Sequence, residues 1–200
     1  IVAKLDSETV IKIVEISLDL IQMLLTSLPE CLIKNINLII ICFLKQLSSR
    51  REMIAEKAKE LIILARETLG ADFLLPHFIT ILNEMALDAS QLKQKISALE
   101  VLNVLIMESD SLSLNDDEQV YIQFTAIVKT LGGIIKVHTS HKGIINPIIG
   151  AILSLRDQNQ DLTFRAIRDE LTHSQLSIMK QIFNSNEKKL ALQFNDYLSQ

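Results

Sequence analysis

Few residues in this 200-residue chain have the type and spacing that catalysis or metal binding requires. The clearest pair is His138 and His141, in the segment HTSH. Two histidines three positions apart can both ligate a zinc ion when a helix carries them on one face. No Cys, Asp or Glu lies close to them in the sequence, and their segment has no clear helical pattern. We therefore expect solvated loop histidines and no metal site.

Carboxylates gather between residues 110 and 118, in the sequence DSLSLNDDE. Such a cluster could bind calcium, but it lacks the glycine and the alternating ligand order of an EF-hand loop. Asn115 followed by Asp116, Asp117 and Glu118 is typical of a helix start, because acidic groups interact favourably with the N-terminal end of the helix dipole. We interpret the segment as a helix-capping loop.

Candidate nucleophiles also have structural explanations. Cys31 and Cys42 lie in an apolar segment without a histidine partner in the sequence, so we expect inert core residues. If one helix carries both, about 16 Å separates them and they cannot form a disulfide. No GxSxG, P-loop or HExxH motif is present. We predict a protein that is not an enzyme and uses no cofactor. The remaining serines fit caps and loops: Ser48, Ser49, Ser111 and Ser113.

Basic residues near the start of two predicted helices are the candidates for binding a partner. If the two helices occupy equivalent positions in successive repeats, their outer faces form one basic ridge. The alternative is a solvated surface with salt bridges, because Glu52, Glu56 and Glu60 alternate with the lysines at helical spacing. The candidates are Arg50, Arg51, Lys57 and Lys59 in one helix and Lys93 and Lys95 in the other.

The apolar stretch 143–155, GIINPIIGAILSL, offers a second surface. It is either a buried spine or an exposed patch that pairs with another chain. Pro147 is expected to weaken its helix. Of the two alternatives, we favour burial.

The composition indicates an all-α protein. Hydrophobic residues make up 48% of the chain and mean hydropathy is +0.29, but the longest apolar stretch, residues 37–44, is far shorter than the ~20 residues of a membrane span. Five Gly and three Pro are too few for a β-sandwich or barrel. A net charge of −4 without a block of five like charges does not suggest a nucleic-acid partner. The lack of a disulfide framework favours the cytoplasm or nucleus.

Apolar periodicity, caps and breaks predict about ten helices. The sixth should begin at 115–118 and end at Gly132 and Gly133, with 134–141 as a loop or short turn. Helix starts near Glu8, Arg50 and Gln91 are 41 to 42 residues apart, which is within the ~40–47 residues of HEAT repeats. We therefore expect residues 1–200 to form one α-solenoid of antiparallel helix pairs. The other predicted helices cover residues 8–27, 29–47, 50–69, 72–86, 91–107, 144–155, 162–171, 174–183 and 187–198.

Several segments carry a family resemblance. They are the aliphatic stretch 33–47 ending in FLKQL, then AEKAKELIILARETLGADF (55–73), ITILNEM (79–85), LKQKISALEVLNVLI (92–106) and the closing SQLSIMKQIFNSNEKKLALQFNDYLSQ (174–200). In these the chain resembles the C-terminal TOG-like HEAT domain of the CLIP-associating protein (CLASP) family of microtubule plus-end regulators. The resemblance implies a docking module for kinetochore, cortical or plus-end partners that sometimes self-associates.

The tubulin-binding TOG domains of that family use an aromatic residue, commonly Trp, and Lys or Arg in their loops. This chain has no Trp, and its corresponding turns read TSLPE, TLGAD and ESDSLSLNDDE, without Lys or Arg. Because tubulin's exposed surface is acidic, tubulin is an unfavourable partner for these loops.

We therefore predict a non-catalytic protein-interaction domain, part of a larger protein, that docks a CLASP-type protein to kinetochore or plus-end factors and can form a homodimer. The expected locations are the cytoplasm, cytoskeleton, spindle, kinetochore and nucleus, with no membrane insertion. The alternatives are a tubulin-binding TOG domain and a HEAT scaffold of an unrelated transport or chromatin complex.

Overall fold

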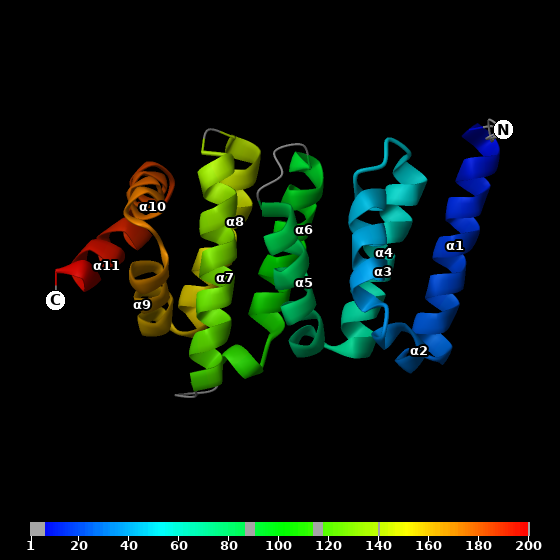
Figure 1. The fold of residues 1–200 in the computed structure, drawn as a ribbon, viewed down its shortest axis with the longest axis horizontal. Coiled ribbons are helices and arrows are strands. Elements are labelled where there is room, and N and C mark those ends of the chain that lie inside the picture. The colour runs from blue at the N-terminus through cyan, green and yellow to red at the C-terminus, as the bar shows by residue number, and fades with distance from the viewer. Residues whose placement is uncertain (1–6, 87–90, 114–117, 140, 200) are drawn as a thin grey trace. The chain divides into compact units, whose positions relative to one another are not determined.

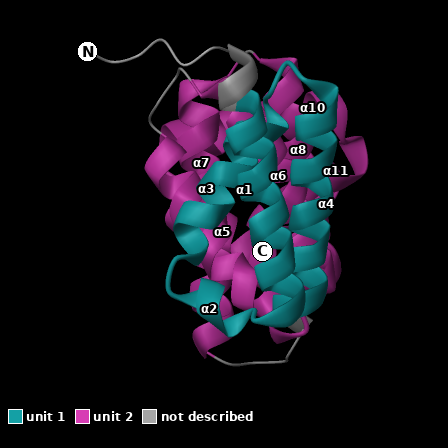
Figure 2. Cartoon of the chain, turned by 90° about the vertical axis from the view of Figure 1, so that its right-hand side faces the viewer, with its two compact units in different colours: residues 1–70 teal, residues 71–200 magenta. Residues whose placement is uncertain are grey.

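The computed structural model describes residues 7–86, 91–113, 118–139 and 141–199, and these contain eleven α-helices, one 3-10 turn and no strand (Figure 1). The all-α prediction is confirmed. Neighbouring helices pack against one another, as in a helical-repeat fold. The contacts divide the chain into two compact units, residues 1–70 and 71–200 (Figure 2).

The first unit is a helix hairpin with one further helix packed on it. Helices α3 (Ile36–Leu47) and α4 (Glu52–Leu69) form the hairpin, and α1 (Ser7–Ser27) packs on α4. The short α2 (Glu30–Ile33) connects α1 to α3. The core of this unit is aliphatic apart from one phenylalanine, and its most buried members are Leu18, Leu25, Ile36, Ile40, Phe43, Leu44, Ala58 and Leu61.

The second unit is a solenoid-like stack. Its helices are α5 (Ala71–Ala86), α6 (Leu92–Glu108), α7 (Glu118–Val137), α8 (Lys142–Gln158), α9 (Gln160–Glu170), α10 (His173–Asn186) and α11 (Lys188–Leu198), with the 3-10 turn η1 (Ser111–Ser113) before α7. Helix α5 pairs with α6, while α5 packs on α7, α6 on α8, and α7 on α9. First helices therefore stack on first helices and second helices on second helices, as in α-solenoids.

The prediction of one continuous helix over 29–47 is wrong. The chain forms a single turn, α2, and begins α3 only after Asn35, whose φ of −119° and ψ of 16° interrupt the helix. Leu38 is 67% exposed, so the apolar residues do not all face the core.

The predicted helix end at Gly132 and Gly133 is also wrong, because α7 continues through both to Val137. A Cβ placed on Gly132 would lie 2.4 Å from Cδ2 of Leu171 and 3.3 Å from Nε2 of Gln175. This glycine therefore lets the segment 171–175 approach α7 closely. The predicted loop over 134–141 loses its first four residues to the helix.

The apolar stretch 143–155 belongs to α8, and its burial is confirmed. Ile144, Ile148, Ile152 and Leu155 are completely buried and lie at helical spacing. Pro147 lies within the second turn of the helix and does not interrupt it. The stretch is a core element of the second unit.

Helix α7 is long and apolar enough to span a membrane by length and composition alone, the one such helix in the described part of the chain. Half of that stretch is buried against other helices, a pattern that the core helix of a globular protein also shows.

Candidate functional site

The basic candidates in the first unit lie at and beyond the start of α4. Arg50 and Arg51 precede the helix, and both are exposed, as is Lys59. Lys57 is less free: its ammonium group lies 3.1 Å from the Asp19 carboxylate and also donates to the side-chain amide oxygen of Gln22. Lys57 thus joins α4 to α1, as expected for a structural ion pair.

Lys93 is exposed, but the expectation that Lys95 lies on an outer face is wrong. Lys95 is fully buried, because it precedes Ala98, Leu99 and Leu102 at helical spacing and shares their core-facing side of α6. Its ammonium nitrogen lies 3.5 Å from the backbone oxygen of Ala86 and 3.0 Å from Nε2 of His138.

Four of the six basic residues, Arg50, Arg51, Lys57 and Lys59, belong to the first compact unit, and Lys93 and Lys95 belong to the second. Of the six, Lys95 contributes no charge to the surface, and Lys57 is held by partners on α1. The exposed members are Arg50, Arg51, Lys59 and Lys93.

His138 and His141 follow the end of α7 and line a shallow surface pocket with Val137 and Thr139. Burial lowers the pKa of His138, and the nearby charges of Lys95 and His141 lower it further. Across the described residues, no three His, Cys, Asp or Glu side chains come together as a metal site would need. The geometry here is that of a neutral imidazole beside a buried lysine.

The predicted acidic capping loop lies partly outside the described residues, which do not include 114–117. Its first part is held by α5: the Asp72 carboxylate accepts hydrogen bonds from Oγ of Ser109 at 2.5 Å and from the backbone N–H of Ser111 at 3.2 Å. Burial raises the pKa of Asp72, but the hydrogen bonds from Ser109 and Ser111 outweigh it and lower the pKa overall.

The expectation that both cysteines are core residues is wrong for Cys31, which is exposed. Cys31 lies on the single turn α2, where Leu32 is the buried residue. Cys42 is half-buried on α3, and its burial raises the pKa of its thiol against the lowering effect of Lys45.

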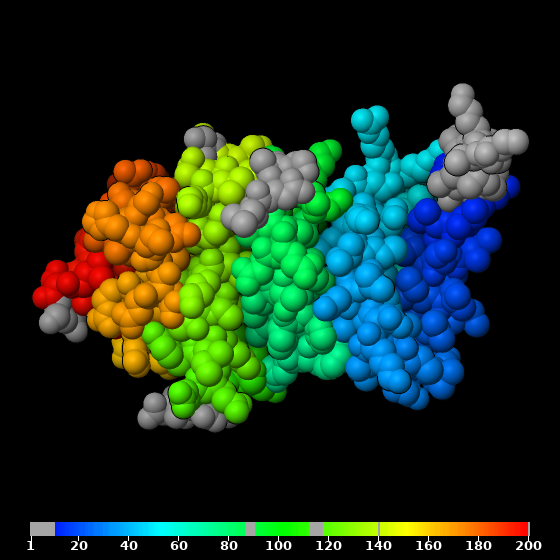
Figure 3. Space-filling model, in the orientation of Figure 1, coloured from blue at the N-terminus to red at the C-terminus, as the bar shows by residue number. Residues whose placement is uncertain are grey.

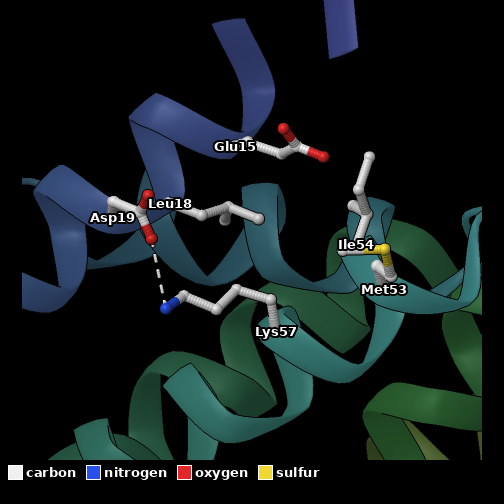
Figure 4. Close-up of a pocket in the computed structure, with 6 residues that line it drawn as sticks. All are labelled: Glu15, Leu18, Asp19, Met53, Ile54 and Lys57. Atoms are coloured by element: carbon white, nitrogen blue, oxygen red, sulfur yellow. Dashed lines mark ion pairs between the residues drawn. The ribbon is translucent and has the colours of Figure 1, made fainter. Parts of the chain in front are cut away.

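A pocket of about 240 Å³ lies between α1 and α4 in the first unit (Figure 4). Leu18 and Ile54 contribute apolar side chains, while the ion pair of Asp19 with Lys57 crosses one side. Met53 and Glu15 complete its lining. These groups form an open hollow, and the ion pair of Asp19 with Lys57 neutralises the charge along one edge of it.

One organised polar surface of the second unit was not predicted from the sequence. Two tyrosines from different helices lie beside two arginines of α9, with a shared aspartate among them. We call this set the Arg–Tyr surface: Tyr121 (α7), Arg165, Arg168 and Asp169 (α9), and Tyr197 (α11).

Each arginine of this surface stacks on a tyrosine. The guanidinium carbon of Arg165 lies 4.4 Å from the ring centroid of Tyr121, and that of Arg168 lies 5.6 Å from the centroid of Tyr197. Both distances are within the range of cation–π contacts. The arginine side chains remain about half exposed, at 53% and 49%.

Asp169 fixes the geometry from the centre. It accepts hydrogen bonds from the Tyr121 hydroxyl at 3.1 Å and from Nε of Arg168 at 2.8 Å, and Nε of Arg165 lies 3.6 Å away. The Arg168 hydrogen bond lowers the pKa of Asp169 despite some burial, and the Tyr121 and Arg165 contacts reinforce this. Burial, the hydrogen bond to Asp169 and its negative charge raise the pKa of Tyr121.

A cluster of phenylalanine rings packs against Tyr197 of the Arg–Tyr surface. The rings of Phe164 and Tyr197 are 5.6 Å apart, and Phe164 also contacts Phe194 at 5.3 Å. Phe194 meets Phe183 edge to face at 5.9 Å. Aromatic pairs at these distances are favourable and hold the side chains in place. The sequence gives no sign of this arrangement, because its residues lie far apart in the chain. They come from positions 121, 165–168 and 197.

Comparisons of the chain with protein families, curated proteins and solved structures find no match.

Proposed function

We propose that the chain is a non-catalytic protein-interaction domain that binds its partner through the Arg–Tyr surface. The observation that carries this proposal is the stacking of two half-exposed arginines on two tyrosine rings. Arginine and tyrosine are among the residue types that contribute most binding energy at protein interfaces.

The surface suits a partner because its side chains are already ordered. Asp169, the two tyrosine rings and the phenylalanines beneath hold both guanidinium groups in one arrangement. Binding then loses little side-chain entropy, which is a cost of up to ~1.5 kcal/mol for each flexible side chain at an interface. A guanidinium whose outer N–H groups face solvent can donate two hydrogen bonds to a partner carboxylate.

The finer proposal is that this domain docks a CLASP-type protein to kinetochore or plus-end factors. Its support is the resemblance of segments 33–47, 55–73, 79–85, 92–106 and 174–200 to the C-terminal domain of that family. The helical-repeat fold is compatible with it, as it is with a tubulin-binding TOG domain or with a scaffold of another complex.

The experiment is a pull-down from mitotic cytosol with the whole chain, followed by identification and purification of the bound protein. We expect the double variant Arg165→Ala/Arg168→Ala to weaken binding of the purified partner at least tenfold. The matched control is Arg50→Ala/Arg51→Ala in the first unit, which should bind as the native chain does. Equal binding by all three proteins would overturn the assignment of the Arg–Tyr surface.

Gel filtration with soluble tubulin separates the alternatives. Co-elution at micromolar concentration would replace the docking function with the tubulin-binding one. A purified partner that belongs to a transport or chromatin complex would overturn the CLASP-type proposal while keeping the interaction function.

A further inference from the structure

The two arginines of the Arg–Tyr surface share one carboxylate. Nε of Arg168 donates to Oδ1 of Asp169 at 2.8 Å, while Nε of Arg165 lies 3.6 Å from Oδ2. The same Oδ2 accepts the hydrogen bond of the Tyr121 hydroxyl. Asp169 therefore gathers both guanidinium groups at one place and turns the Nε of each toward itself.

The outer nitrogens of these arginines, Nη1 and Nη2, are the groups left for a ligand. Within the described part of the chain, neither arginine has a hydrogen-bond or ion-pair partner at these atoms. In Figure 3 the surface of α9, gold to orange, lies directly beside that of α7, yellow-green. The paired N–H groups of a guanidinium match the oxygens of a carboxylate or of a phosphate. An anion that approaches this face therefore meets donors from both arginines.

The Arg–Tyr surface has one uncompensated positive charge. Its two arginines are positive, and Asp169 is negative because the Arg168 hydrogen bond holds the pKa of that carboxyl below its ordinary range. Tyr121 stays neutral, since burial and Asp169 raise its pKa. The neighbouring Glu170 adds no net charge because it pairs with Lys129 at 2.7 Å. One carboxylate therefore completes the charge balance of the surface.

A phosphorylated side chain would exceed that balance. A phosphate monoester carries a charge of about −1.5 to −2 at pH 7. Its attraction to the surface grows in proportion to this charge, whereas the cost of taking the charge out of water grows with its square. The surplus negative charge would also lie close to the ionised Asp169. The net charge of −4 on the whole chain further opposes a polyanion.

We propose that the partner presents a single Asp or Glu side chain, that its carboxylate binds between Arg165 and Arg168, and that Asp169 sets the preference for a carboxylate over a phosphate. The inference rests on the proposed function, because it takes the Arg–Tyr surface as the binding site. Asp169 is a positioning residue here. It acts on the ligand through the charge and the orientation of the two arginines.

A nuclear magnetic resonance titration of the whole chain tests the carboxylate preference. The probes are two capped pentapeptides, GGDGG and the same peptide with phosphoserine in place of aspartate, at equal ionic strength and neutral pH. We expect GGDGG to shift the Nε–H resonances of Arg165 and Arg168 saturably, and the phosphoserine peptide to bind at least threefold more weakly. The exposed Arg50 and Arg51 of the first unit are the control and should show no saturable shift. Equal or tighter binding of the phosphoserine peptide, or no saturable shift with either, would overturn the proposal.

Asp169→Asn tests the residue that sets the preference. The variant loses the negative charge but keeps an amide oxygen that can accept from Arg168 or Tyr121, and the exposed position tolerates the change. We expect the phosphoserine peptide to bind this variant at least threefold more tightly than GGDGG does, which reverses the native order. The matched control is Glu100→Gln, which removes the same charge at an exposed position of α6 and should keep the native order. An unchanged preference in Asp169→Asn would overturn the role of Asp169.

The purified partner separates failure of this inference from failure of the proposed function. Partner binding that survives Arg165→Ala/Arg168→Ala removes the Arg–Tyr surface as the binding site, and both proposals fail. If that double variant loses the partner while Asp169→Asn still prefers the aspartate peptide, the proposed function stands and only this inference fails.

Discussion

The ammonium nitrogen of Lys95 lies 3.0 Å from Nε2 of His138, and the pair joins α6 to the end of α7 inside the second unit. With the lysine fully buried, a proton on the imidazole would place two positive charges side by side. Neutral His138 is therefore the form that the fold accommodates.

The first prediction follows from this contact. Burial and the charges of Lys95 and His141 hold the folded-state pKa of His138 below its ordinary value of about 6.5. The unfolded chain then binds the proton more readily, so the free energy of unfolding falls as the pH drops from about 6.5 toward the folded-state pKa. Urea titrations at pH 7.5 and pH 5.5 measure this loss.

His138→Gln should reduce that loss, because glutamine can still contact Lys95 but does not titrate. The control is His173→Gln at the exposed start of α10. If the native chain and the His138→Gln variant lose the same stability on acidification, His138 is not the group responsible.

The two neighbouring glycines of α7 give the second prediction. A Cβ on Gly133 would meet Cβ of Ala86 at 3.5 Å, an ordinary contact, so Gly133→Ala should gain ~0.5–1 kcal/mol from helix propensity. A Cβ on Gly132 would come within 2.4 Å of the buried Leu171, which must move. We expect Gly132→Ala to lower the melting temperature and Gly133→Ala to raise it; a shift of equal sign and size in both would contradict the close approach.

The third prediction concerns the start of α10, where Thr172 and Gln175 form a capping box. The backbone N–H of Gln175 donates to Oγ1 of Thr172 at 3.3 Å, and the N–H of Thr172 donates to the Gln175 side chain at 2.9 Å. Thr172→Ala removes the first bond and should cost ~1 kcal/mol of unfolding free energy. Thr172→Ser keeps the hydroxyl and should retain most of the stability in the same urea titration.

The fourth prediction separates the two thiols. Cys31 is exposed, whereas Cys42 is half-buried and its burial raises the pKa of its thiol. Because the thiolate is the reactive form, a disulfide reagent should modify Cys31 faster by at least ~10-fold in the folded chain. The fast phase should disappear in Cys31→Ser and persist in Cys42→Ser; two equal phases would place Cys42 at the surface.

Local pattern was sufficient for the fold class and for much of the helix layout. The apolar stretch 143–155 predicted the burial of α8, because a segment with so few polar residues is most stable when other helices cover it. Glycine was a poorer guide. At Gly70, with a φ of +84°, it ends α4. At Gly132 it allows close helix packing, and the sequence does not distinguish the two uses.

Prediction from residue type alone was also wrong for part of the candidate binding site. A lysine near a helix start was expected to be solvated, yet the register of α6 turns Lys95 inward with Leu99 and Leu102. The Arg–Tyr surface could not be predicted, because Tyr121, Arg165 and Tyr197 are brought together only by the stacking of α7, α9 and α11.

Both tyrosines of the chain, Tyr121 and Tyr197, belong to the Arg–Tyr surface, and the chain has no tryptophan. The intrinsic ultraviolet fluorescence of the native protein therefore originates almost entirely at this one place. A ligand that displaces either guanidinium from its ring would change the emission without any attached dye. The protein thus supplies a label-free optical reporter, and a partner that lacks tryptophan can be titrated against it directly.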